Sequence, residues 1–210
     1  MKKLVPISAR VMTVLAVGLA ALAGCDAAPE AGGKLKSLEI LDEKAEPLRT
    51  QFNRDAGKVR LLFILDPVCA TCLRGLADLD RDLVASLSAD VPVYLVHVPV
   101  IGGREKHIAG AASLIHNSNV RHYWNPSGSL GEQAGAALPL RSKGEPVYAW
   151  DVWMVYGPDA VWGDRLPQPN RLMHQLPRID NMPGVSPLDS KAFTATVRSL
   201  VSKTNKAARP

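Results

Sequence analysis

The strongest constraint on the fold is an apolar strand pattern followed at once by two cysteines and a helical pattern. Residues 59–65, Val-Arg-Leu-Leu-Phe-Ile-Leu, are nearly all apolar, as is typical of a strand covered on both faces. Cys69-Ala70-Thr71-Cys72 comes next, and leucines then recur at helical spacing at Leu76, Leu79, Leu83 and Leu87. A second apolar run over residues 91–98 predicts another strand. This order indicates an α/β fold with a parallel sheet, in which Cys69 lies where a helix begins.

Shorter patterns predict further elements on both sides of this unit. Residues 38–41 predict a short edge strand. A second helix is predicted between His107 and His116, and Ser127 is predicted to cap a third helix that runs toward Ala137.

The last part of the chain predicts a hairpin and a closing helix. Pro146 is predicted to open a strand that ends at Tyr156, and Gly-Pro-Asp at residues 157–159 is predicted to turn the chain into a return strand near Val161. Ser186 and Pro187 are good first residues for a helix. The apolar face of that helix consists of Phe193, Val197, Leu200 and Val201.

The first 24 residues have the layout of a secretory signal peptide. Basic residues come first, and an uncharged apolar run begins at Val11. Its end, Leu22-Ala23-Gly24-Cys25, resembles the bacterial lipobox, in which the cysteine sulfur receives a diacylglyceryl group and becomes the first mature residue. The alternative is an uncleaved membrane anchor, although the run is shorter than the roughly 20 residues that span a bilayer.

The lipobox has consequences for location. Residues 25–37 are rich in Ala, Gly and Pro and predict a flexible tether between the lipid and the domain. Asp26, directly after the lipidated Cys25, resembles the inner-membrane retention signal of enteric bacteria. We therefore expect a periplasmic protein held to a membrane, the inner membrane by preference, through its lipid anchor.

The net charge of +5 does not argue for a nucleic-acid partner. Lys2, Lys3 and Arg10 fall in the signal peptide, which contains no acid, so removing it lowers the net charge by three. No later segment forms a dense basic stripe, and residues 205–210 are expected to be a solvated tail. The remaining length suits one domain, predicted over residues 38–204.

Cys69 and Cys72 are the only thiols left once Cys25 carries lipid. In a compartment where disulfides persist, they can pair only with each other. A structural disulfide usually closes a long loop, because the constraint on the unfolded chain grows with loop size, whereas this pair encloses two residues. The spacing favours reversible exchange; an inert buried pair and half of a metal site are the alternatives.

The element order, with Cys-x-x-Cys at a helix start, resembles the thioredoxin fold over residues 38–201. Gly57-Lys58-Val59, which leads into the strand, and Tyr-Trp-Asn-Pro-Ser-Gly-Ser-Leu-Gly at residues 123–131 look like the membrane-tethered thiol-disulfide branch that serves cytochrome maturation. The resemblance implies a thioredoxin-like fold with a helical insertion before the strand that follows a cis-proline. It also implies thiol-disulfide exchange with protein substrates and no diffusible cofactor. The sequence leaves the direction of electron flow open, because that direction depends on the reduction potential. The membrane anchor and the lack of further domains favour a reductase fed by a membrane thiol transporter.

The position of each cysteine predicts its role. At a helix start, the Cys69 thiolate faces free backbone N–H groups and the positive end of the helix dipole, so Cys69 is predicted to attack. Cys72, one turn into the helix and less exposed, is predicted to resolve the mixed disulfide.

The resemblance also suggests a substrate-binding position. Pro146 lies where the fold places a cis-proline that faces the disulfide and leaves a backbone edge free for the substrate chain, and Pro139 is the competing candidate. Glu145 departs from the apolar or hydroxyl residue common in the family, and a carboxylate there would destabilise a nearby thiolate. Pro146 and Glu145 are therefore the predicted substrate-binding residues.

The motif departs from the family in two further respects. Pro67-Val68 replaces the aromatic residue that usually precedes the first cysteine, and the strand over residues 61–65 contains no acid to accept a proton. Asp66 is the nearest substitute, although Asp before Pro is also ordinary turn chemistry.

Two rival functions remain open. The first is a copper chaperone in which Cys69, Cys72 and a histidine hold the ion, although the spacing of the histidines matches no closed metal site: His97, His107, His116 and His122. The second is a non-catalytic lipoprotein that binds a partner. The segment 162–176, long and apolar for a simple turn, is predicted either to wall the redox site or to pack on the surface.

Overall fold

The computed structural model of the protein describes residues 35–207. The predicted signal peptide, Cys25 and most of the tether lie outside this range. The helices are α1 (Glu46–Arg54), α2 (Ala70–Asp82), α3 (Ile108–Ala112), α4 (Ser129–Ala137) and α5 (Ser190–Ala207), with short 3-10 turns at Val84–Ser86 and Glu105–His107. The strands are β1 (Leu38–Ile40), β2 (Arg60–Leu65), β3 (Val93–His97), β4 (Arg121–Trp124), β5 (Arg141–Ser142), β6 (Glu145–Pro146), β7 (Val152–Tyr156), β8 (Arg171–His174) and β9 (Val185–Pro187). None of the helices in this part of the chain is long and apolar enough to cross a membrane.

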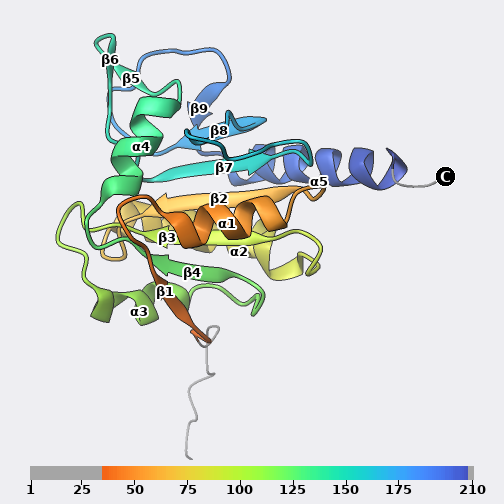
Figure 1. The fold of residues 1–210 in the computed structure, drawn as a ribbon, viewed down its shortest axis with the longest axis horizontal. Helices are drawn as coiled ribbons and strands as arrows, with labels where there is room; N and C mark the ends of the chain where they lie inside the picture. Colours follow the sequence, from red (N-terminus) through yellow and green to blue (C-terminus); the bar gives the residue numbers. More distant parts are fainter. Residues whose placement is uncertain (1–34, 208–210) are drawn as a thin grey trace, which may run out of the picture. The chain divides into compact units, whose positions relative to one another are not determined.

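A mixed seven-stranded sheet organises the described residues, in the order β1-β4-β3-β2-β7-β8-β9 (Figure 1). Strands β1, β4, β3 and β2 run parallel to one another, and β7 is antiparallel to β2. Strand β8 is antiparallel to β7, and β9 pairs with β8 in parallel. The carboxyl ends of β2 and β3 and the start of β7 therefore lie at the same end of the sheet.

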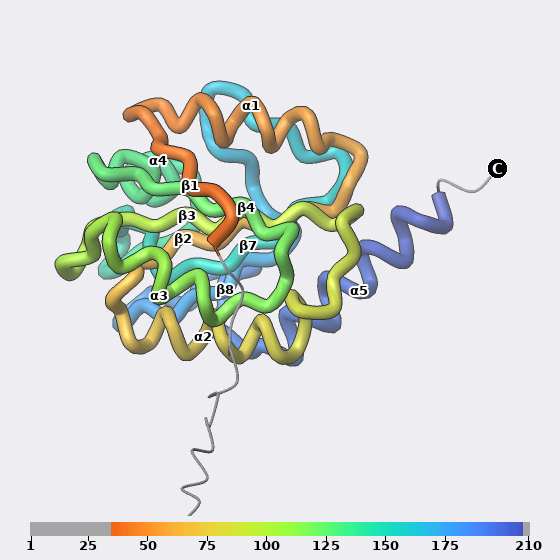
Figure 2. Tube along the Cα trace, turned by 90° about the horizontal axis from the view of Figure 1, so that it is seen from below, coloured from red at the N-terminus to blue at the C-terminus, as the bar shows by residue number. Residues whose placement is uncertain are grey.

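Helices cover both faces of this sheet, so the fold is α/β, as the sequence predicts. On one face, α1 and α4 pack their buried side chains, such as Phe52 and Leu130, against alternate residues of the central strands, such as Leu62. On the other face, α2 and α5 pack against the strand residues that point to that side, such as Phe63. Leu76 of α2 and Phe193 of α5 are among the buried residues of this layer. Figure 2 shows α1 and α4 on one side of the strands and α2, α3 and α5 on the other.

Strand β2 is buried at every position because it lies between these two layers. This confirms the prediction from its apolar run. The edge strand β1, the strand β3, and the helices α2, α3, α4 and α5 are also confirmed, within a few residues of their predicted bounds.

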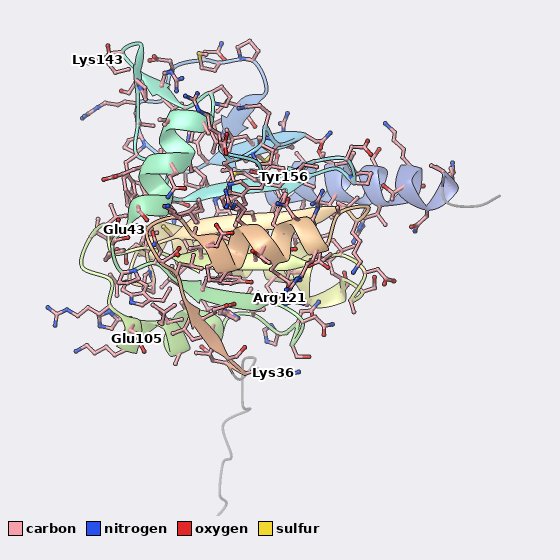
Figure 3. All side chains as sticks on the ribbon, viewed as in Figure 1. Lys36, Glu43, Glu105, Arg121, Lys143 and Tyr156 are labelled. Carbon is pink, nitrogen blue, oxygen red and sulfur yellow. The ribbon has the colours of Figure 1, made fainter. Side chains whose placement is uncertain are left out.

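Pro146 does not open the strand that pairs with β2. That strand, β7, begins at Val152, while Pro146 is exposed in β6, which pairs with β5 in a separate two-stranded sheet. Lys143 marks the turn between these two short strands (Figure 3). Every peptide bond among residues 35–207 is trans, so the prediction of a cis-proline at Pro146 or Pro139 is wrong.

The predicted return strand near Val161 is also wrong. Val161 is 63% exposed, and the strand that returns beside β7 is β8, ten residues later. The intervening segment instead packs on α1, where Trp162 contacts the ring of Phe52 with the ring centroids 5.7 Å apart. The side chain of Asn53 bonds both the N–H and the carbonyl of Trp162.

Two predicted helix starts are displaced because other polar side chains cap the helices. In α4 the N-cap is Gly128, and the Asn125 side chain accepts the N–H of Leu130 at 2.9 Å. The hydroxyl of Ser127, the predicted cap, accepts the N–H of Ser129, the first residue of the helix, at 3.3 Å. Helix α5 begins at Ser190, after Asp189, whose carboxylate accepts the N–H of Ala192 at 3.0 Å. Ser186 and Pro187, the predicted start, belong to β9.

Candidate functional site

Cys69 lies at the point where β2 gives way to α2. It is the N-cap residue of α2, with extended backbone angles, and its Sγ accepts the backbone N–H of Cys72 at 3.2 Å. Because an N-cap group faces the unpaired N–H groups of the first helical turn, this hydrogen bond is the one expected for a sulfur in that position. The predicted helix-start position of Cys69 is confirmed.

Cys72 lies one turn into α2, on the face that packs against the sheet. Its exposed fraction is 0%, compared with 5% for Cys69. Val68, directly before Cys69, is exposed, and so are Ala70 and Thr71, which lie between the two cysteines. Both cysteines are free thiols. Burial raises the pKa of the Cys72 thiol, and the negative charge of Asp151 raises it further. Cys69 is the less buried of the two thiols.

Asp151 is the third member of the site, and sequence analysis did not identify it. One carboxylate oxygen of Asp151 and the two sulfurs of Cys69 and Cys72 all lie within 4.8 Å of one another, and all three residues are buried. We call these residues the Cys-Cys-Asp group. Burial raises the pKa of Asp151 to about 6, although hydrogen bonds from Cys72 and Trp153 oppose the shift.

The pairing of β2 with β7 explains why Asp151 reaches the cysteines. Ile64 is opposite Val152 in the antiparallel register, so the residue before Val152 lies beside the end of β2, from which the chain continues to Cys69. The backbone of Asp151 is left-handed, with φ of 51°, a conformation that Asp tolerates better than most residues. Tyr156, labelled in Figure 3, marks the opposite end of β7.

Two donors hold the Asp151 carboxylate in place. The indole N–H of Trp153 donates to Oδ1 at 3.2 Å. The side-chain amide of Gln175, with its nitrogen turned toward the site, donates to the same oxygen at 3.0 Å and to the carbonyl of Thr71 at 3.3 Å. The backbone N–H of Gln175 also donates to the carbonyl of Asp151 at 3.1 Å. The side-chain bonds from Trp153 and Gln175 are both made to Oδ1.

Asp66 performs the turn chemistry that was one of its two predicted roles. Its side chain is fully buried, and Oδ1 accepts the N–H of Val68 at 2.9 Å. Oδ2 accepts the N–H groups of Val100 and Ile101 at 2.8 and 2.7 Å, and that of Gly103 at 3.2 Å. Asp66 therefore ties the loop after β3 to the loop that presents Cys69.

The predicted wall segment, residues 162–176, reaches the site only at its end. Met173 in β8 belongs to the same buried cluster as Cys69 and Cys72, and Gln175 contacts Asp151 as described. Trp150, half-buried, packs against this cluster and also against the cluster on the opposite face of the sheet. Trp162, by contrast, belongs to the opposite face.

The other predicted residues are not brought together with the cysteines. Glu145 and Pro146 lie exposed in the β5–β6 sheet, and their role in substrate binding stays a prediction. Among residues 35–207, the group that could hold a metal ion with Cys69 and Cys72 contains no histidine. The ring of His97 instead stacks on that of His122, with centroids 5.9 Å apart.

His116 likewise has a partner elsewhere. Its Nδ1 lies 2.5 Å from Oδ2 of Asp80, a buried carboxylate of α2, and its backbone N–H donates to the other oxygen at 3.1 Å. The copper site formed by the cysteines and a histidine therefore finds no support in the described residues.

No protein-family model matches the sequence, and no curated protein is significantly similar to it. The function is therefore argued from the Cys-Cys-Asp group. That group combines a sulfur at a helix N-terminus, a fully buried second sulfur, and a carboxylate oxygen that lies within 4.8 Å of both.

Proposed function

We propose that this protein exchanges dithiol and disulfide with protein substrates, with Cys69 as the attacking sulfur and Cys72 as the resolving sulfur. The observation that carries the proposal is the position of Cys69 as the N-cap of α2, where its sulfur accepts an N–H of the first helical turn. A hydrogen bond to sulfur and the positive end of a helix both favour the thiolate, which is the nucleophile in exchange.

In the reducing direction the reaction has two steps. The Cys69 thiolate attacks one sulfur of a substrate disulfide, which forms a Cys69–substrate bond and releases the other substrate sulfur as a thiolate. Cys72 then attacks Cys69, which forms the Cys69–Cys72 disulfide and releases the second substrate sulfur. The substrate gains two electrons and two protons, of which one comes from the Cys72 thiol and the other from water, because Cys69 attacks as a thiolate. Asp151, a hydrogen-bond partner of Cys72, is the side chain placed to carry the Cys72 proton to the departing sulfur.

We further propose that the domain is thioredoxin-like. The order of elements supports this: β2, the cysteines, α2, the parallel strand β3, the antiparallel pair β7–β8, and the closing helix α5. The segment between β3 and β7 is then the insertion, and it contains α3, β4, α4 and the β5–β6 sheet. Asp151 occupies the position directly before β7 that the resemblance assigns to a proline.

The proposed setting is the periplasmic face of a membrane, reached through the signal peptide and lipid on Cys25. This rests on the lipobox pattern of residues 22–25. A protein anchored there would draw its electrons from a membrane thiol transporter and pass them to periplasmic protein disulfides.

Thiol alkylation tests the proposal directly. The reduced full-length protein in detergent is treated with limiting iodoacetamide, and the labelled peptides are located by mass spectrometry. We expect Cys69 to be labelled first, and both cysteines to be protected after equilibration with oxidised glutathione. Preferential labelling of Cys72, or an unreactive pair that glutathione cannot oxidise, would refute the proposal.

A further inference from the structure

The Cys-Cys-Asp group has a second chemical property, which follows from its charge. We propose that the reduced site binds one zinc ion through the sulfurs of Cys69 and Cys72 and a carboxylate oxygen of Asp151, and that the bound ion blocks thiol exchange. The block on exchange rests on the proposed function, whereas the binding of zinc does not.

The geometry is close to that of a zinc site. The three ligand atoms already lie within 4.8 Å of one another. Zinc–sulfur bonds of about 2.3 Å and zinc–oxygen bonds of about 2.1 Å in tetrahedral arrangement need sulfurs about 3.8 Å apart, and oxygen about 3.6 Å from each. Side-chain movements of about 1 Å therefore complete the site, without any change in β2, α2 or β7.

The charge of the group also calls for a cation. The two sulfurs and the carboxylate belong to residues that are at most 5% exposed. Cysteines bind a metal ion as thiolates and release their protons on binding, so the three ligands together carry three negative charges in the metal-bound site. A divalent cation supplies the missing positive charge, and metal binding is a general means of keeping thiolates ionised in a buried site.

The carboxylate is oriented as in a metal site. Metal ligands are usually held by an outer set of hydrogen bonds that fixes the ligating atom. Here Trp153 and Gln175 both donate to Oδ1 of Asp151, at 3.2 and 3.0 Å, and so fix the orientation of the carboxylate.

The ligand set favours zinc over copper. Thiolates suit both Cu(I) and Zn²⁺, whereas the third ligand of this group is a hard carboxylate oxygen, which Zn²⁺ accepts and the soft Cu(I) ion does not favour. Two thiolates and one carboxylate are a borderline set that suits Zn²⁺, and in zinc sites with three protein ligands the fourth position holds water or a substrate atom. Oxidation to the Cys69–Cys72 disulfide removes two of the three ligands, so zinc can bind only the reduced protein.

Cobalt titration tests the site by a readout that does not depend on exchange. Co²⁺ is added to the reduced, chelator-treated full-length protein, and its visible and sulfur charge-transfer bands report the ligands. We expect one equivalent to bind tetrahedrally, to be displaced by Zn²⁺, and to be released on oxidation. Asp151→Asn should weaken binding at least tenfold, as measured by competition with a chelator, whereas Asp164→Asn, at an exposed acid, should not.

X-ray absorption of the zinc-loaded wild-type protein provides a second readout that needs no variant. We expect two sulfur ligands together with oxygen ligands. Failure of the reduced protein to bind Co²⁺, binding that survives oxidation, or an unchanged affinity in the folded Asp151→Asn protein would overturn the proposal. Exchange is measured separately with excess chelator, so that loss of exchange with intact metal binding would refute only the proposed function.

Discussion

Replacing Asp151 with Asn should make the reduced protein more stable at neutral pH. The carboxylate is buried beside Cys72, and burial raises its pKa from 3.8 to about 6. A carboxyl group with a raised pKa in the folded state binds protons more tightly there than in the unfolded chain, so its ionisation opposes folding. Asn has the same shape, keeps an oxygen that can accept the indole N–H of Trp153, and carries no charge.

The sign and size of the effect follow from the two pKa values. Below pH 3.8 the carboxyl is protonated in both states and costs nothing. Between pH 3.8 and 6 the unfolded state ionises first, and stability falls as pH rises. Above pH 6 the cost is constant, at up to about 3 kcal/mol, because each pKa unit corresponds to about 1.4 kcal/mol. We expect Asp151→Asn to recover about 1 to 3 kcal/mol, since the lost hydrogen bond from Cys72 offsets part of the gain.

Urea unfolding of the reduced protein in chelator, at pH 7.5 and pH 4, measures this difference. The Asn variant should be the more stable protein at pH 7.5 and show little or no advantage at pH 4. Asp164→Asn, at an exposed position, is the control and should change stability by less than about 0.5 kcal/mol at either pH. An Asp151→Asn protein that is less stable by the same amount at both values would show that Asp151 is a structural residue, and the reasoning would fail.

Three further predictions test other parts of the account. Burial lowers the pKa values of His97 and His122 to about 3 and about 4. The free energy of unfolding should therefore fall by about 2 kcal/mol for each histidine between pH 7 and pH 5, because the unfolded chain binds the protons first. His97→Gln should remove about half of this pH dependence, as measured by urea unfolding. Asp66→Ala should lose at least about 2 kcal/mol and deprotect four amides in hydrogen exchange, because these backbone N–H groups lose their acceptor: Val68, Val100, Ile101 and Gly103. Cys25→Ser should move the protein from the membrane to the soluble fraction of cells, and a variant that stays membrane-bound with its signal still cleaved would contradict lipidation.

The parts of the fold that the sequence predicts are those with a strong local pattern. The apolar run of β2 and the leucine spacing of α2 define the core unit and place Cys69 at a helix start, because burial and helix periodicity leave few alternatives there. Strand β4, helix α1 and strand β9 were not predicted. Strands β4 and β9 are three or four residues long, and such short segments carry too little periodicity to distinguish them from loops.

Asp151 could not be identified as a site residue because its role depends on a long-range pairing. It follows Cys72 by 151 − 72 = 79 residues in the sequence and meets it only through the antiparallel register of β2 and β7. One local signal was present: an acid within an otherwise apolar strand pattern, between Trp150 and Val152. Pro146 was misplaced because a local pattern was misleading. It stands before an apolar run, as the proline of the thioredoxin fold does, but the strand β7 begins only at Val152.

The central claim is that Cys69 and Cys72 have different roles in exchange, and trapping of mixed disulfides tests it most directly. The Cys72→Ser and Cys69→Ser proteins are expressed in their native compartment, and their complexes are separated on non-reducing gels. We predict that Cys72→Ser accumulates partner proteins linked through Cys69, because the resolving sulfur is gone, and that Cys69→Ser accumulates none. Equal trapping by both variants, or by neither, would contradict the account.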